Sequence, residues 1–272
     1  MYGTQVADRT QPIGQDENAA PTVQVDFTLG LGEGRLDVSV LVPSGRVTLT
    51  QILPVLQSLS SDIMASTVEQ TEAEGHRISC RAGCGACCRQ MVPLSIFEAE
   101  ALGDWIRTLP QERQDELARR FDAALIALRD GGMLERLNPK SLAEKNEQAA
   151  PLALDYLMLR VACPFLVDES CSIHAIRPLI CREYLVTSPA EFCVFPTRDK
   201  VTGVPVPVKL SSAMFKLGVD VEGGVRGWIP LVFLFAWMKA GVRPGDAIRG
   251  EGPAVLYEVV KRLATGDAAG GV

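Results

Sequence analysis

The sequence predicts a mainly α-helical protein with a small N-terminal β-hairpin and irregular cysteine-rich loops around a metal site. Apolar residues alternate with polar ones near the N-terminus, and from about residue 50 they recur with a helical period. Eight cysteines fall in two blocks, and the first block places four thiols within nine residues. We therefore expect a disordered leader at 1–21, one domain at 22–265 with a metal-binding core at about 78–195, and a flexible tail at 266–272.

The composition is that of a protein with a buried core, because 47% of the 272 residues are hydrophobic and 22% are charged. The net charge of −6 argues against nucleic acid as a partner. The most apolar run, 229–238, contains Pro230 and is too short to cross a membrane. The N-terminus has no signal-peptide pattern, so we expect a cytoplasmic protein whose thiols stay reduced.

The β-hairpin is expected at 22–42, where Val23, Val25 and Phe27 alternate with polar residues and a similar pattern follows from Leu36. A glycine-rich segment, Gly-Leu-Gly-Glu-Gly, separates the two runs at 30–34. Such glycines could open a nucleotide or S-adenosylmethionine pocket if a helix came next. A second strand pattern follows instead, which favours a turn.

A helix at about 50–75 is predicted by one apolar face, with Pro54 near its start and Gly75 at its end. It leads directly to the first cysteine block. After that block, Ser95-Ile-Phe-Glu98 has the pattern of a capping box and opens a helix toward Trp105. The next helix follows Pro110 and ends at 131–132. Its buried stripe consists of Leu117, Phe121, Leu125 and Leu128.

The remaining chain predicts shorter elements. A polar connection or loose helix is expected at 139–150, and a short buried helix at 152–161 precedes Cys163. Two prolines, Pro205 and Pro207, mark an extended stretch. Three helical segments are then expected near 212–217, 228–240 and 254–263.

All eight cysteines are candidate metal ligands because thiolates bind zinc and iron, and crowded thiolates repel one another unless a cation is present. The adjacent pair Cys87 and Cys88 is the most informative feature, since neighbouring side chains diverge. Both can hardly bind one tetrahedral zinc together with Cys84. Two metal centres, one polynuclear cluster or one idle thiol remain open, and a disulfide framework is disfavoured. The candidate ligands are Cys80, Cys84, Cys87, Cys88, Cys163, Cys171, Cys181 and Cys193.

Other residues beside the cysteines have two interpretations each. Arg81, Arg89 and Arg182 could offset the charge of a thiolate site or be ordinary solvated arginines. The glycines that flank Cys84 could let the backbone fold round a metal or simply form a turn. His174 follows Cys171 by three positions and is a candidate ligand, although eight thiols already suffice. We interpret His76 as a surface residue.

These motifs together resemble a zinc- or iron-chelating cysteine-cluster family, often called YkgJ-like. The resemblance covers about residues 78–195 and rests on three ordered blocks. They are Cys80-Arg-Ala-Gly-Cys84-Gly-Ala-Cys87-Cys88, Cys163-Pro-Phe-Leu166 and Cys171-Ser-Ile-His174-Ala-Ile-Arg177-Pro178-Leu-Ile-Cys181-Arg182-Glu-Tyr184. His174 stands where the family often has tyrosine, which argues against a general ligand role for it.

The resemblance implies a cytoplasmic metal-binding protein whose cysteines hold an iron–sulfur cluster or zinc. Arg177, Arg182 and Tyr184 would contact the cofactor, and Arg177 and Tyr184 could equally pin the local chain by packing and hydrogen bonds. Flagellin lysine N-methylase is similar to this family, so methyl transfer or redox chemistry on a protein is conceivable. No catalytic residue is assigned.

Three functional hypotheses follow. The first is an iron–sulfur protein, with one four-iron cluster and room for a second metal, that acts on a redox partner or a protein substrate. The second is a structural zinc module for protein interaction. The third is a methyltransferase-like enzyme that uses S-adenosylmethionine. The sequence contains no P-loop, no Gly-x-Ser-x-Gly elbow and no His-Glu-x-x-His helix.

Overall fold

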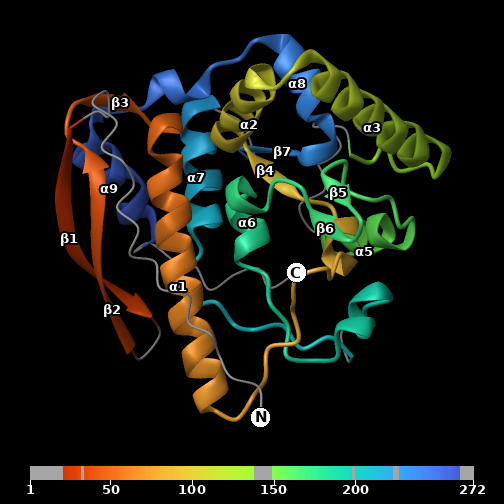
Figure 1. The fold of residues 1–272 in the computed structure, drawn as a ribbon, viewed down its shortest axis with the longest axis horizontal. Helices are drawn as coiled ribbons and strands as arrows, with labels where there is room; N and C mark the ends of the chain where they lie inside the picture. Colours follow the sequence, from red (N-terminus) through yellow and green to blue (C-terminus); the bar gives the residue numbers. More distant parts are fainter. Residues whose placement is uncertain (1–20, 32–33, 138–148, 198–199, 223–226, 264–272) are drawn as a thin grey trace.

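The computed structural model describes residues 21–31, 34–137, 149–197, 200–222 and 227–263 (Figure 1). The predicted leader, except residue 21, the tail and most of the connection at 139–150 lie outside these ranges. The described chain is mainly helical with an N-terminal hairpin, and its cysteines lie in irregular segments, as predicted. No helix in those ranges has both the length and the apolar character needed to cross a membrane.

The helices are α1 (Leu53–Ala73), α2 (Ile96–Thr108), α3 (Gln111–Asp130), α5 (Ala149–Met158), α6 (Leu179–Arg182), α7 (Leu210–Glu222), α8 (Leu234–Ala240) and α9 (Gly252–Leu263). Short 3₁₀ helices are η1 (Thr50–Ile52), η2 (Ala86–Arg89), η4 (His174–Ile176), η5 (Ala190–Val194), η6 (Leu231–Phe233) and η7 (Pro244–Ala247). The strands are β1 (Thr22–Leu31), β2 (Gly34–Pro43), β3 (Arg46–Thr48), β4 (Pro93–Ser95), β5 (Leu166–Val167), β6 (Ser170–Cys171), β7 (Trp228–Pro230) and β8 (Arg249–Glu251).

The predicted hairpin is confirmed, since β1 and β2 pair antiparallel from Thr22 opposite Pro43 to Leu31 opposite Gly34. The glycine-rich segment joins these strands, and β2 rather than a helix follows it. The turn interpretation therefore fits the structure better than a cofactor pocket, although residues 32 and 33 lie outside the described ranges.

The largest core lies between the hairpin and helices α1, α7 and α9, which stand side by side in one half of the molecule (Figure 1). Leu56 of α1 and Val42 of β2 are fully buried there, as are Leu217 of α7 and Val259 of α9. Elements from both ends of the sequence thus share one apolar interior, and its burial is the main source of stability in this half.

Helix α2 connects this core to the rest of the molecule. The predicted capping box is confirmed: Ser95 Oγ accepts a bond from the Glu98 backbone, and the Glu98 carboxylate accepts one from the Ser95 backbone. Glu98 is only 3% exposed, and its other oxygen accepts a bond from the Leu179 N–H at 2.7 Å. One buried carboxylate therefore caps α2 and also holds the start of α6.

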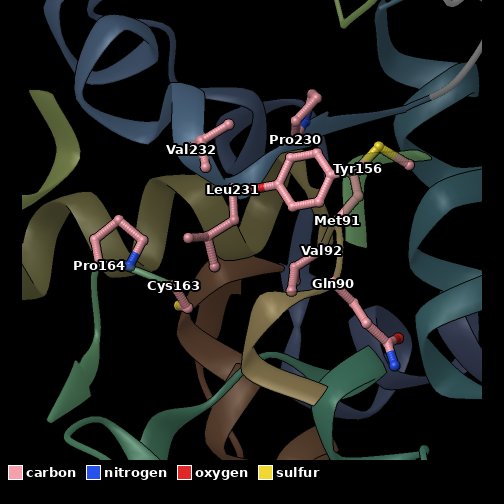
Figure 2. A pocket seen from close by; sticks show the side chains of 9 residues that line it. All are labelled: Gln90, Met91, Val92, Tyr156, Cys163, Pro164, Pro230, Leu231 and Val232. Carbon is pink, nitrogen blue, oxygen red and sulfur yellow. The ribbon is translucent and has the colours of Figure 1, made fainter. Parts of the chain in front are cut away.

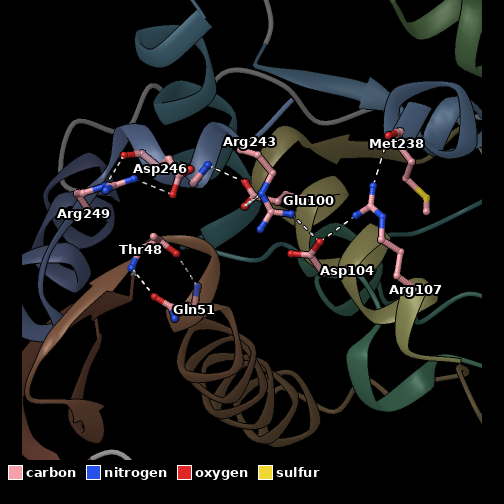
Figure 3. Close-up of polar contacts among 10 residues, drawn as sticks. Thr48, Gln51, Glu100, Asp104, Arg107, Met238, Arg243, Asp246 and Arg249 are labelled. Carbon is pink, nitrogen blue, oxygen red and sulfur yellow. Dashed lines mark hydrogen bonds and ion pairs between the residues drawn. The ribbon is translucent and has the colours of Figure 1, made fainter. Parts of the chain in front are cut away.

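Two more acidic residues of α2 hold the C-terminal part of the chain (Figure 3). Buried Glu100 accepts a bond from the Gly245 N–H at 2.7 Å and pairs with Arg243 at 3.2 Å. Asp104 bridges Arg243 and Arg107 at 2.6 and 2.9 Å. The buried carboxylate Glu100 is thus satisfied by a backbone donor and an arginine, as a buried charge requires.

One predicted helix begins later than expected. Residues 228–230 form strand β7, which pairs with β4, and the α-helix starts only at Leu234. Pro230 explains the difference, because it cannot donate a helical hydrogen bond, whereas it is tolerated at the end of a short strand. The other late segments form α7 and α9, and α5 occupies the predicted helix before Cys163.

Candidate metal centre

The structure places the eight cysteines on short elements and loops, and all eight are free thiols. In the first block, Cys80 and Cys84 lie in the loop after α1, and Cys87 and Cys88 lie on η2. In the second block, Cys163 follows α5, Cys171 lies on β6, Cys181 on α6 and Cys193 on η5. Free thiols agree with the expectation that these cysteines do not form a disulfide framework.

Backbone hydrogen bonds fold the second block onto the first. The Cys163 N–H donates to the Cys88 carbonyl at 2.7 Å, and the Leu166 N–H donates to the Cys163 carbonyl at 2.8 Å. Leu166 in turn pairs with Cys171 across the β5–β6 ladder. Helix η5, which carries Cys193, packs against η2. Thiols some eighty residues apart in sequence are therefore neighbours in space.

The adjacent thiols Cys87 and Cys88 have pKa values shifted in opposite directions. The Cys88 thiol donates a hydrogen bond to Cys87 and lowers the pKa of Cys87 to about 7. The same bond and burial together raise the pKa of Cys88. Cys87 is exposed, whereas Cys88 is half-buried. One thiolate next to one thiol is thus available to a metal before the other cysteines deprotonate.

The surrounding thiols resist deprotonation. Burial raises the pKa of Cys163 to about 12, and the thiolates of Cys171 and Cys87 add to the rise. Burial also raises the pKa of Cys193 to about 11 and that of Cys181 well above its usual value, with nearby thiolates adding to both. A bound cation would remove this repulsion and release the thiol protons. Within the described ranges, no three Cys, His, Asp or Glu side chains already form a coordination shell for an ion.

Arg177 lies near thiols of both cysteine blocks. Burial raises the pKa of Cys80 and Cys171, and the Arg177 guanidinium opposes that rise in both. Its Nε is buried and has no hydrogen-bond partner among the residues that the structure describes. A buried donor without a hydrogen-bond partner destabilises the folded protein, and a ligand that accepts a hydrogen bond from it removes this cost. The donor set and this unpaired N–H together fit an anionic thiolate–metal group.

Arg182 and Tyr184, the other predicted cofactor contacts, bond to the protein itself. Arg182 donates to the backbone carbonyls of Ala175 and Arg177 at 2.5 and 3.1 Å, which shapes the loop before α6. Tyr184 forms a hydrogen bond with the Gln90 side chain, and burial raises its pKa. His174 is exposed on η4, and nearby Arg177, partial burial and Arg182 lower its pKa in that order.

The arginines next to the first cysteine block behave differently from one another. Arg81 is exposed, whereas Arg89 donates to the Gly85 carbonyl at 2.8 Å and pairs with Glu169 at 2.5 Å. Glu169 sits in the β5–β6 turn, where Asp168 and Glu169 have φ of 47° and 57°. A side chain at Gly85 would collide with this turn, so the glycine permits the close approach of the two blocks. The two-residue turn, which sequence analysis missed, could have been read from Asp-Glu between Leu-Val and Ser-Cys.

Residues 79–198 match a family model named CxxCxxCC, which is described as "Putative zinc- or iron-chelating domain". This segment of the chain is similar to that family. The match spans less than half of the 272 residues and agrees with the predicted core at about 78–195. No curated protein and no solved structure matches the chain.

Two hollows border Cys163, which lies within the matched segment. The first is a cavity of about 10 Å³, enough for about one water, and Figure 2 shows Cys163 and Tyr156 among its lining side chains. The second is an open groove of about 460 Å³ between α3 and the segment from Val161 to Asp168. Alanines of α3, among them Ala123 and Ala127, keep this groove open. Cys163 therefore lies between the thiol region and a surface hollow.

Proposed function

We propose that this protein is an iron–sulfur protein in which cysteines of both blocks hold at least one four-iron cluster. The observation that carries the proposal is that free thiols of both cysteine blocks gather around the adjacent pair Cys87–Cys88, with Cys163 and Cys171 next to Cys88. The Cys88 thiol donates a hydrogen bond to Cys87, so both thiols of the pair face one site, and a polynuclear centre that takes several thiolates close together suits such a pair. The first block also has the three-residue and two-residue spacings found in iron–sulfur loops.

The protein's own residues would tune such a group. Arg177 would donate its unpaired Nε–H toward the thiolate–metal group and offset its negative charge. Arg182 and Tyr184 would hold the surrounding loop through their bonds to Ala175 and Gln90. A bound cluster supplies one-electron chemistry, whose potential depends on hydrogen bonds to sulfur and on burial.

A redox partner or a protein substrate is the class of partner that we propose. Support comes from two exposed aromatic side chains, Phe192 and Phe195, which flank Cys193 and are 38% and 57% exposed. The Arg160 guanidinium lies 5.1 Å from the Phe195 ring centre. Exposed aromatic residues and arginine are typical of interface contacts.

Metal analysis of protein purified without oxygen tests the proposal. We expect about four iron and four sulfide per cluster, a brown colour, and a paramagnetic signal after reduction with dithionite. The variant Cys163→Ser should lose iron. The control variant Ser170→Ala, which changes an exposed residue next to Cys171, should retain it. Colourless protein with stoichiometric zinc and no iron would refute the cluster and support the structural zinc module.

The methyltransferase-like hypothesis needs a separate measurement. Calorimetric titration of the metal-loaded protein with S-adenosylmethionine should show saturable heat if this cofactor binds. No heat with fully loaded protein would exclude it as a cosubstrate, and would leave the proposed iron–sulfur function unaffected.

A further inference from the structure

We propose that the free edge of strand β1 is an interface at which two copies of this chain pair in solution. The two β1 strands would run antiparallel about a two-fold axis and join the two hairpins into one four-stranded sheet. This interface uses none of the cysteines, so the inference goes beyond the proposed metal-binding function.

Strand β1 is the outer strand of the hairpin (Figure 1). Among the described residues the sheet consists of β1 and β2, and β2 is the strand that packs closely against α1 and α9. In an antiparallel ladder, every second residue of an edge strand directs its backbone N–H and C=O away from its partner strand. Half of the ten residues of β1 therefore present backbone donors and acceptors to which no other described residue bonds.

The β1 edge lacks the features by which proteins usually keep a strand edge from pairing. Its ten residues contain no lysine and no proline, and its register with β2 runs without a bulge from Thr22 to Leu31. The side chains of Val25, Phe27 and Leu29 pack against the core, so no inward-pointing charge blocks a further strand. A bare edge of this kind promotes non-specific association, which favours a specific strand as its partner.

The side chains of β1 match those of a second copy of the same strand. Gln24 and Asp26 are exposed, and Asp26 is the one charged residue of the strand. The Gln24 amide donates to Asp26 of its own strand at 2.9 Å, so both groups lie on one face. With the two-fold axis at Val25, Gln24 of each copy lies opposite Asp26 of the other, and an amide donor meets a carboxylate twice. On the core-facing side, Val23, which is 40% exposed, would lie opposite Phe27 and become covered.

Other registers of the same two strands are less favourable. An axis at Asp26 would place the two carboxylates directly opposite each other, where like charges repel. An axis between two residues would place the core-facing side chains of one hairpin on the solvent side of the other. The polar and apolar pattern of β1 thus selects the register centred on Val25 over its neighbours.

The pairing would leave the cysteine-bearing segments accessible. Strands β5 and β6, which lie between Cys163 and Cys171 in the sequence and include Cys171, are on the opposite side of the molecule from β1 (Figure 1). A two-fold dimer through β1 would therefore carry its two metal-binding regions at its outer ends.

Sedimentation equilibrium of the full-length, metal-containing protein over a wide concentration range tests the interface. We expect the mass to rise from that of one chain toward that of two as the concentration increases. The variant Gln24→Glu places like charges opposite each other twice and should raise the dissociation constant about tenfold. Gln24→Lys should lower it about tenfold, because each lysine would lie opposite an Asp26 carboxylate.

Two further variants separate this effect from a folding defect. Gln111→Glu makes the same change at an exposed residue of α3, a helix far from β1 (Figure 1), and should leave the dissociation constant unchanged. Combining Gln24→Glu with Asp26→Lys should restore dimer formation, because opposite charges would then face each other across the axis.

Hydrogen exchange of the unaltered chain at low and high concentration gives a second measurement that does not depend on variants. Protection should rise with concentration at alternate amides of β1 and stay constant in α1. A mass of one chain at every concentration would overturn the proposal, as would a dimer whose dissociation constant responds to neither Gln24→Glu nor Gln24→Lys. A mass of two chains without added protection in β1 would place the contact elsewhere and would overturn it as well.

Discussion

The two halves of this molecule are stabilised in different ways. In the first half, the hairpin and the helices α1, α7 and α9 bury long apolar faces, with side chains such as Leu56 and Leu217 at 0% exposure. In the half that holds the cysteines, the elements that carry or adjoin the second cysteine block are short: β5, α6 and η5 contain two, four and five residues. Elements this short bury little apolar surface and gain little from cooperative hydrogen bonding. We therefore expect the first half to fold by hydrophobic burial alone, whereas the segments that carry the cysteines, which add only a few buried side chains such as Phe165 and Ile173, should depend more on a bound metal.

Removal of the metal should produce the largest effect and should separate the halves. Structural thiolate sites contribute on the order of 10 kcal/mol of apparent folding free energy. After chelation we expect hydrogen exchange to rise strongly in η2, β5, β6, α6 and η5 and to change little in α1, α7 and α9. Equal loss of protection in both halves would contradict the comparison.

A cavity in the first half should produce the converse result. Leu56→Ala removes a fully buried side chain of α1 and should lower the free energy of unfolding by about 3 kcal/mol. The metal content per folded molecule should not change. Ser58→Ala, an exposed position on the same helix, is the control and should alter stability by less than about 0.5 kcal/mol. Metal loss caused by Leu56→Ala would show that the halves are strongly coupled.

Glu98 joins the halves and should make their coupling depend on pH. Burial raises its pKa above the ordinary value of 4.5, so the folded state favours the protonated carboxyl more than the unfolded chain does. This contribution to stability is fully present below pH 4.5 and is lost as the pH rises toward the raised pKa.

Glu98→Gln should therefore weaken the pH dependence of the free energy of unfolding above pH 4.5. At low pH the variant should lose about 1 kcal/mol, because one amide end cannot accept the bond from Leu179 or Ser95. Chemical denaturation across this pH range measures both the pH dependence and the loss of stability. If the free energy of unfolding of the variant changes with pH as much as that of the unaltered protein, Glu98 is not the cause of the pH dependence.

The Arg89–Glu169 pair should give the smallest effect. It holds the β5–β6 turn against η2, yet the two side chains are 17% and 52% exposed, so solvent screens the charges. A double-mutant cycle with Arg89→Met and Glu169→Gln should yield a coupling energy of about 0.5 kcal/mol. The more exposed pair Arg129–Asp130, whose side chains are 65% and 63% exposed, serves as the control and should show less coupling energy.

Much of the first half was predictable because its signals are local. Alternation of side chains predicted the hairpin, and helical periodicity predicted α1 and α9. Local signals also predicted two helices outside this half: helical periodicity predicted α3, and the Ser95–Glu98 capping box predicted the start of α2. The strand at 228–230 was not predicted, because a three-residue strand has no periodicity and depends on its pairing with β4.

In the half that holds the cysteines, the sequence predicted the chemistry of the site but not the arrangement of its residues. The number, type and spacing of the cysteines were enough to predict a metal centre, since few other structures need thiols at such density. Their grouping was not predictable from the spacing. Arg81 adjoins Cys80 in sequence but is exposed, whereas Arg177, almost a hundred residues further along the chain, lies near the Cys80 thiol.

The sequence by itself determined the kinds of elements and the chemistry of the site, because periodicity and residue type act over a few neighbouring positions. Only the tertiary structure decided which thiols meet, how the Arg89–Glu169 pair joins the two blocks and where Arg177 lies. These arrangements depend on hydrogen bonds and packing between segments some eighty residues apart, such as the bond from Cys163 to Cys88. Local sequence patterns carry no information about such contacts until the chain has folded.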